Sequence, residues 1–239
     1  KGENNGFIDN KRIRYFNIGD DDWRETDEWP PASSEVQSLY LSPNKMLSSN
    51  TPSQSSVSGY TYDPSKPITI TEGTNIWSRS AQMRERSVLL ERDDVLVFET
   101  EALEEDLEIT GDISLELFAS SSAIDTDFTA AIVDVYPDGY SLLIQEGILR
   151  ASHRNKNESP SHINPDEIYQ FNIDLWSTSY VIPAGHKLRL EISSSNFPRF
   201  ARNLNNGEPF GMSWDIVIAE QKIYFGEKYP SRLLLPVIR

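Results

Sequence analysis

The sequence predicts an all-β protein, a jelly-roll β-sandwich that forms one domain over residues 1–239. Short stretches rich in Val, Ile, Phe and Tyr recur along the chain, and Gly, Pro, Asn, Asp and Ser separate them. Helical patterns are scarce, because only residues 81–90 could make up to two helical turns. Long polar connections over 42–59 and 196–213 suit a Greek-key order of strands better than a simple meander.

Ten strands are expected in chain order. Their residue ranges are 13–18, 38–41, 94–100, 107–120, 128–136, 141–152, 167–176, 187–195, 214–225 and 232–238. We interpret residues 42–59 as a long surface loop because serine dominates their second half.

The strand over 128–136 is expected to lie in the middle of a sheet, because both of its faces are apolar. The turn residues Pro137-Asp138-Gly139 then predict a hairpin with the strand that follows. We expect Gly147 to mark a bulge in that second strand.

In the strand after residue 186, Leu188, Leu190 and Ile192 should point inward, while the charged residues between them point outward. Trp176 and Trp214 fall inside strand patterns, so we expect both rings in the core.

Composition excludes several classes of protein. A formal charge of −15 disfavours nucleic acid and anionic membranes as partners. No run of about 18 apolar residues occurs, so no segment is expected to span a membrane. The chain has no cysteine, which excludes a disulfide framework and a cysteine nucleophile and favours a cytoplasmic protein. Since the chain begins at Lys1, we interpret it as part of a larger protein with sequence upstream.

Motifs that would carry catalysis are missing from the sequence. There is no Gly-x-Ser-x-Gly elbow, no dinucleotide fingerprint and no P-loop, and no cofactor is expected. His153 and His162 lie nine residues apart without a helix to align them, which disfavours a metal pair. His186 is interpreted as a turn residue that bonds nearby backbone.

Four carboxylates lie close together in the stretch SSSAIDTDFTAAIVDVYPDG, residues 120–139. Asp125 and Asp127 are the candidates for a calcium site, because loops of β-sandwiches bind this ion. The alternative is architectural: both side chains accept hydrogen bonds at the entry of the strand, and Arg150, Arg154 or Arg199 neutralises them. We expect the architectural role and no metal.

A series of motifs runs in the same order as in a known family. They are DDDWRETDEWPPASSEVQSLYLSPNKML, YTYDPSKP, ERDDVLVFETEALEEDLEITGDISLELFASSSAIDTDFTAAIVDVYPDG, GILRAS, PAGHKLRLEISSSNFPRFARNLNNG and LLLPVI. Together they resemble the C-terminal domain of the cocaine esterase-like (CocE/NonD) serine hydrolases, which are related to X-Pro dipeptidyl-peptidases.

The resemblance implies a galactose-binding-like jelly roll without catalytic residues. It also implies an α/β-hydrolase domain upstream in the same chain, which carries the catalytic triad and on which the present domain packs. The stretch that walls the acyl pocket in the esterase corresponds to residues 73–83, with Ile76 and Trp77 as apolar candidates. The chain departs from the family here, because residues 80–86 replace the expected Gly-Pro-x-Asp-Gln pattern.

Two other functions stay open. Five tryptophans and ten tyrosines suit an independent carbohydrate-binding module, since sugars stack on exposed rings. An acidic face could also serve a scaffold that binds a basic partner. Homo-oligomer formation is a further open question.

Overall fold

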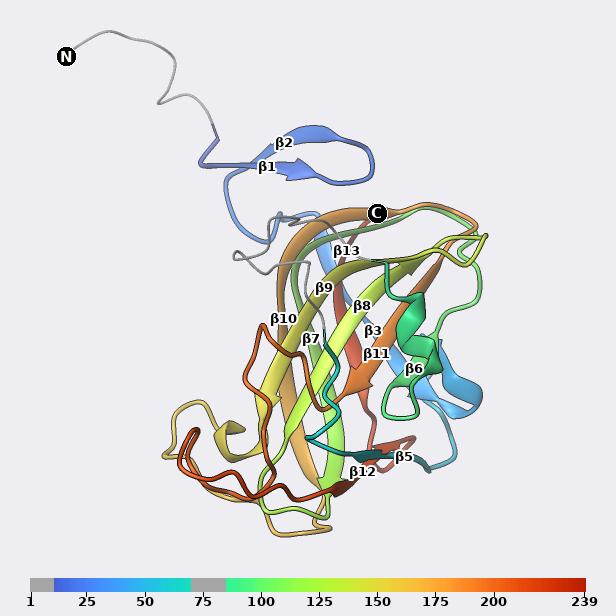
Figure 1. Cartoon of the computed structure of the whole chain (residues 1–239). Helices are drawn as coiled ribbons and strands as arrows, with labels where there is room; N and C mark the ends of the chain where they lie inside the picture. Colours follow the sequence, from blue (N-terminus) through green and yellow to red (C-terminus); the bar gives the residue numbers. More distant parts are fainter. Residues whose placement is uncertain (1–10, 70–84) are drawn as a thin grey trace, which may run out of the picture.

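The computed structural model describes residues 11–69 and 85–239, and within them it is built almost entirely of β-strands (Figure 1). Their bounds are β1 Ile13–Asn17, β2 Asp22–Thr26, β3 Ser34–Ser42, β4 Met46–Ser48, β5 Ser56–Tyr62, β6 Leu96–Glu99, β7 Leu107–Ser121, β8 Asp127–Val135, β9 Ser141–Arg150, β10 Tyr169–Ile182, β11 Lys187–Ser193, β12 Ala219–Phe225 and β13 Arg232–Ile238. Three short 3-10 turns accompany them: η2 Pro43–Lys45, η3 Ser87–Glu91 and η4 Ala151–His153. The prediction of an all-β fold is confirmed.

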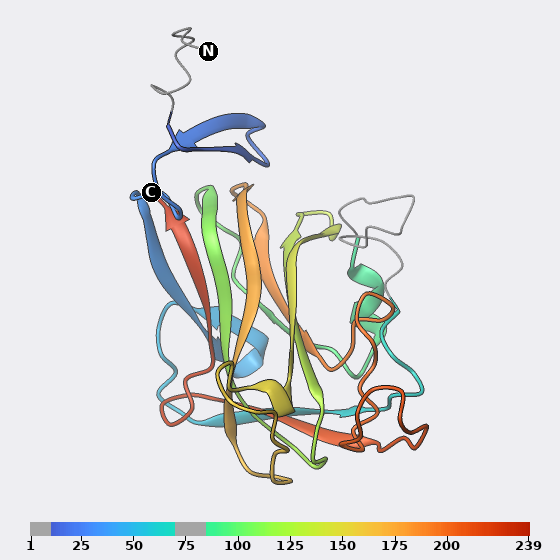
Figure 2. The same ribbon diagram turned by 90° about the vertical axis from the view of Figure 1, so that its left-hand side faces the viewer.

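One large sheet folds back on itself to enclose the core. Its strand order is β5-β12-β7-β13-β3-β4-β6-β11-β8-β9, and β10 pairs with the other edge of β7. The short β4 joins the two halves, since it pairs with β3 and makes one parallel bridge to β6. Figure 2 shows the two halves facing each other.

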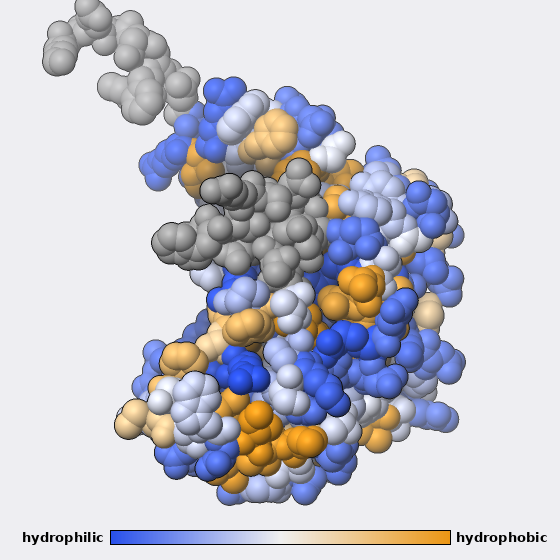
Figure 3. Space-filling view, viewed as in Figure 1, coloured by the Kyte–Doolittle hydropathy of each residue, from blue (hydrophilic) through white to orange (hydrophobic). Residues whose placement is uncertain are grey.

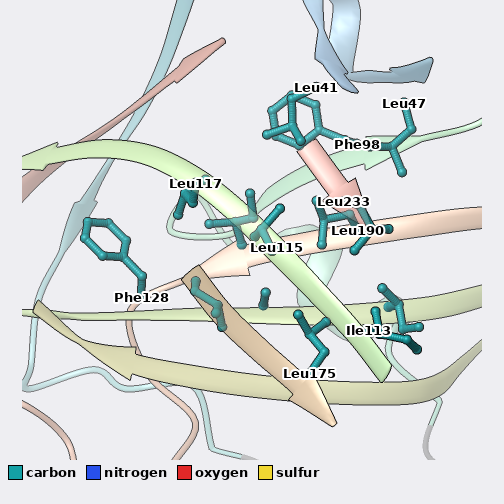
Figure 4. Close-up of a cluster of buried hydrophobic side chains, with 14 of the residues drawn as sticks. Leu41, Leu47, Phe98, Ile113, Leu115, Leu117, Phe128, Leu175, Leu190 and Leu233 are labelled. Carbon is teal, nitrogen blue, oxygen red and sulfur yellow. The ribbon is translucent and has the colours of Figure 1, made fainter. Parts of the chain in front are cut away.

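The core lies between the two halves. Leu115, Leu190 and Leu233 come from three different strands and meet there (Figure 4). Phe128 of β8 packs against Phe171 of β10 with ring centroids 4.8 Å apart. Contacts between strands from both halves explain why the sheet stays closed.

The hairpin prediction is confirmed. β8 is buried at every position and pairs antiparallel with β9 through the turn at Asp138 and Gly139. The Asp138 carboxylate accepts a hydrogen bond from the Tyr140 amide at 3.0 Å.

The Gly147 interpretation is wrong in detail. The pairing Ala130–Gly147 is regular, and the bulge in β9 lies at Ile144, between the pairs Ile132–Gln145 and Val133–Leu143. A side chain at Gly147 would lie 2.0 Å from the backbone oxygen of Asp174 in β10. Glycine is therefore required by the close approach of two strands.

Two other expectations need correction. The region 42–59 is not one loop, because β4 and the first part of β5 lie in it. Residues 22–26, which gave no strand signal, form β2. In the stretch 81–90, for which at most two helical turns were expected, residues 87–90 belong to the 3-10 turn η3, and residues 81–84 lie outside the described residues. None of the helices in the described ranges is long and apolar enough to cross a membrane.

Candidate functional site

The predicted pocket-wall residues Ile76 and Trp77 lie outside the described residues. The positions that flank their segment are defined. Thr69 makes a β-bridge with Phe197, and Glu85 makes one with Leu142 of β9. Thr69 and Glu85, the described residues on either side, therefore lie beside β11 and β9.

Asp125 and Asp127 form a buried hydrogen-bonded pair at the entry of β8. The Ser152 amide donates to Asp125 Oδ1 at 2.8 Å, and Asn203 Nδ2 donates to both carboxylates at 3.1 and 3.0 Å. Arg150 donates to both oxygens of Asp127, from Nε at 2.8 Å and from Nη2 at 3.2 Å. Burial raises the pKa of Asp127, while the Arg150 guanidinium opposes that rise. Every carboxylate oxygen thus already has a protein donor, as an architectural role requires.

The three histidines contact different partners in different parts of the chain. His162 Nε2 lies 3.0 Å from the backbone oxygen of Gly207. The expectation for His186 is wrong, because its Nδ1 lies 2.8 Å from the buried carboxylate of Asp134, which also accepts a hydrogen bond from Tyr180. Within 11–69 and 85–239, no group of three or more His, Asp or Glu side chains could hold a metal ion.

A buried ionic cluster covers the outer face of β8 and its neighbours. Arg86 Nε donates to Glu191 at 2.6 Å, and its Nη1 lies 3.7 Å from Glu146. Arg199 also donates to Glu146, at 2.5 Å, and Arg189 lies 3.8 Å from Glu191. Arg189 and Glu191 do point outward as expected, yet their exposed fractions are only 4% and 2%.

The β1–β2 hairpin stands apart from the sandwich at one end, near the C-terminal end of β13 (Figures 1 and 2). Backbone hydrogen bonds fix it to β10, since the Ile18 amide donates to Ser179 at 3.0 Å and the Val181 amide donates to Ile18 at 2.8 Å. Arg24 of β2 pairs with Glu108 of β7. That carboxylate raises the pKa of Arg24, so the guanidinium stays charged. The hairpin is held firmly.

The inward face of the hairpin packs on the segment that leads into β3. The rings of Tyr15 and Trp29 meet edge to face at 5.3 Å, and Trp29 Nε1 donates to Asp112 at 3.3 Å. Gly19 lies so close to β10 that a side chain there would be 2.7 Å from the Val181 oxygen, and its φ of +109° also favours glycine.

The outward face of the hairpin is open to solvent and carries an apolar pair next to the Arg14–Glu25 ion pair. Phe16 and Trp23 are paired across the strands with ring centroids 5.4 Å apart, and Trp23 is 56% exposed. Arg14 lies over the Trp23 ring at 5.0 Å, and Ile18 extends the exposed surface. We call Phe16, Ile18 and Trp23 the hairpin face. Such a preformed apolar surface suits a protein partner.

Sequence reasoning did not single out Phe16 and Ile18 of the hairpin face, although a signal existed. Residues 13–18 were predicted as a strand, and their alternation places Arg14, Phe16 and Ile18 on one side. The prediction that Trp176 and Trp214 lie in the core is wrong. Trp176 is 60% exposed because a bulge in β10 turns it outward, and Trp214 precedes β12 in an irregular segment.

Comparisons with known proteins agree with the fold. The model of the X-Pro dipeptidyl-peptidase C-terminal non-catalytic domain matches residues 5–234. Cocaine esterase from Rhodococcus sp. (strain MB1 Bresler) is 35% identical over 251 residues, which cover 100% of this chain and 44% of that protein. The chain thus spans less than half the length of this relative.

Two solved structures are also similar. An aminopeptidase from a marine sediment Thaumarchaeota archaeon gives a TM-score of 0.88 at 26% identity, over 96% of this chain and 41% of that one. An α-amino acid ester hydrolase gives 0.85 at 27% identity, over 94% and 41%. The family and these relatives give no support to the carbohydrate-binding alternative.

Proposed function

The chain belongs to the family of X-Pro dipeptidyl-peptidase C-terminal non-catalytic domains, and from this membership we propose that it serves as the accessory domain of a serine hydrolase. In this role it packs on an α/β-hydrolase domain of the same polypeptide. The parent enzyme hydrolyses acyl esters or X-Pro peptides. The chain itself contributes no catalytic residue.

The observation that carries the proposal is the hairpin face. It is built before any partner binds, because hydrogen bonds to β10 and the Arg24–Glu108 pair hold the hairpin in place. Within the described residues, β1 and β2 form a sheet of only two strands, so unpaired backbone groups remain at its edges. In a polypeptide with an upstream hydrolase domain, the connection between that domain and this chain would come just before β1.

A second element of the proposal concerns the acyl pocket. We keep Ile76 and Trp77 as its wall on the strength of the resemblance. The bridges of Thr69 with Phe197 and of Glu85 with Leu142 hold the two residues that flank this segment, and they support the proposal.

Activity measurements test the catalytic part. The product of the complete gene and the 239-residue chain are each assayed with a nitrophenyl ester and with an X-Pro nitroanilide, with and without a serine-directed inhibitor. We expect inhibitor-sensitive turnover only for the complete product, and the preferred substrate identifies its class. Inhibitor-sensitive turnover by the chain alone, or a complete gene without a hydrolase domain, would overturn the proposal.

Binding measurements test the docking part. The upstream region and this chain are produced as two polypeptides and their association is measured by calorimetry. Trp23→Asp should weaken association at least about tenfold, because it places a charge in an apolar contact. Val57→Asp, an equally accessible position on β5, is the matched control and should bind like the wild type. Equal effects of both substitutions would exclude the hairpin face as the contact.

A further inference from the structure

A cavity lies on the long segment between β11 and β12. Its volume is about 140 Å³, and its walls include the apolar residues Leu204, Phe210 and Trp214. In Figure 3, apolar side chains gather on the lower part of the molecule, over which this segment runs in Figure 1. Figures 1 and 2 both show the segment and the β1–β2 hairpin toward opposite ends of the sandwich. The cavity is therefore separate from the hairpin face.

Hydrogen bonds within the segment hold the cavity in shape. The Val217 amide donates to the Leu204 oxygen at 2.9 Å, and Asn206 Nδ2 donates to the Asp215 oxygen at 2.7 Å. These two bonds join the arms of the loop on which the cavity lies. Walls that are fixed before a ligand arrives do not have to be ordered on binding, which favours affinity.

Two arginines, Arg150 and Arg202, also line the cavity. Arg150 donates from Nε and Nη2 to the carboxylate of Asp127, which fixes the guanidinium. No acceptor within the described residues takes its Nη1. Arg202 donates from Nη1 to the Pro64 oxygen at 2.8 Å, and no carboxylate of the described chain forms an ion pair with it. Both arginines therefore have donors left for a ligand.

The charges around the cavity favour an anion. Asp127 offsets the charge of Arg150, whereas nothing in the described chain offsets the charge of Arg202. Among the lining residues Glu208 is the one carboxylate, and its side chain is exposed. Because water screens an exposed charge, Glu208 weakens the attraction of an anion less than its sign alone suggests.

The shape and the walls of the cavity favour an aromatic ring. An apolar cavity of about 150 Å³ can hold a benzene ring, so this one has room for a single ring. Phe210 and Trp214 can pack against such a ring edge to face or with an offset. A guanidinium also pairs with a carboxylate through two parallel hydrogen bonds. Apolar walls with a few placed polar groups are typical of small-molecule sites.

We propose that this cavity binds a small aromatic carboxylate. The ring lies among Leu204, Phe210 and Trp214, and the carboxylate accepts hydrogen bonds from Arg202 and from Nη1 of Arg150. The ligand is bound without any covalent step. A hydrolase domain that docks on the hairpin face would leave this site open.

Calorimetric titration of the 239-residue chain with phenylacetate tests the proposal. We expect a dissociation constant between about 10 µM and about 1 mM, a range that a ligand of about ten non-hydrogen atoms can reach. Phenylacetamide lacks the charge and acetate lacks the ring, so each should bind at least about tenfold more weakly. Phenylacetate that binds no more tightly than either analogue overturns the proposal.

Substitutions test the role of the charges. Arg202→Met keeps a long side chain but removes the guanidinium, so it should weaken phenylacetate binding at least about tenfold. Arg14→Met is the matched control, since Arg14 also lies beside an exposed ring, 5.0 Å from that of Trp23, and it should bind like the wild type. Glu208→Gln removes a like charge and should bind phenylacetate at least as tightly as the wild type. Equal losses in the two arginine variants, or a loss of binding in Glu208→Gln, would contradict the assignment.

A second readout places the ligand in the cavity. Trp214 is 87% exposed, so acrylamide should quench its fluorescence, and phenylacetate should protect it. Trp214→Phe retains a ring for binding and should remove most of that protection. Binding of phenylacetate without any protection of Trp214 would overturn the proposal. These outcomes do not depend on the proposed hydrolase, because no catalytic domain takes part.

Discussion

The inner and outer faces of β8 and β11 are both buried, but they exclude water by different chemistry. On the inner face, Phe128, Ile132 and Leu190 pack in an apolar core. On the outer face, the segment that includes η3 brings Arg86 to within 2.6 Å of Glu191. Burial of apolar groups stabilises the fold in proportion to the apolar area that is removed from water. A buried ion pair must first offset the desolvation of both charges. Substitutions on the two faces should therefore behave differently.

The largest effect is expected on the inner face. Phe128→Ala should lower the free energy of unfolding by about 3–5 kcal/mol, because it opens a cavity against Phe171. Urea denaturation measures the loss. Trp176→Ala removes an exposed ring and should cost less than about 1 kcal/mol. A Phe128→Ala loss as small as that of Trp176→Ala would contradict the inner-face assignment.

The outer face should tolerate paired changes better than single ones. Arg86→Met leaves Glu191 buried without its closest cation and should cost about 3 kcal/mol. The value lies at the low end of the usual range because Arg189 lies 3.8 Å from the same carboxylate. The double variant Arg86→Met/Glu191→Leu should recover most of that loss. If the double variant is instead less stable than Arg86→Met alone, the charges of the cluster stabilise the fold and do not merely fill space.

A third test addresses the close approach of β9 to β10 at Gly147. Gly147→Ala should cost about 1–3 kcal/mol, because the new methyl group forces β9 away from β10. Gly59→Ala is the matched control. Its methyl group would lie 2.9 Å from the nearest backbone oxygen, compared with 2.0 Å at Gly147. Thermal denaturation should therefore show a smaller loss at Gly59, and the reverse order would contradict the close-approach explanation.

The contrast between the faces also explains what could be predicted from the sequence. Alternation identified Leu188, Leu190 and Ile192 as inward residues, since apolar periodicity reports directly on the core. The same pattern assigned Arg189 and Glu191 to the other side, but alternation within one strand does not show that another segment covers that side. The covering segment includes Arg86, which is more than 100 positions from Glu191 in the chain.

The candidate site was less predictable for a similar reason. The resemblance indicated a partner domain, yet the hairpin face depends on how β1 and β2 project from the sandwich. Trp214 illustrates the limit, because an apolar stretch before β12 resembles a strand whether it is buried or exposed. By contrast, Arg150 was one of the three arginines expected to neutralise Asp127, and its Nε lies 2.8 Å from Asp127 Oδ1.

The smallest expected effect belongs to Asp127, a buried charged residue at the start of β8, directly before the core residue Phe128. Asp127→Asn should cost about 1–2 kcal/mol, because Arg150 is partly exposed and regains water when the pair is lost.

This cost should also depend on pH. Burial raises the pKa of Asp127 above its ordinary value of 3.8, so the folded chain holds this proton more tightly than the unfolded chain does. The contribution of Asp127 to stability therefore falls as pH rises from 3.8 through the raised pKa. Asparagine does not titrate, so the deficit of the variant should be larger near about pH 4 than near about pH 7. Urea denaturation at both pH values measures it, with Asp138→Asn in the exposed turn as the control for the substitution itself. A deficit that grows with pH would mean that Arg150 and Asn203 lower the pKa of Asp127 more than burial raises it.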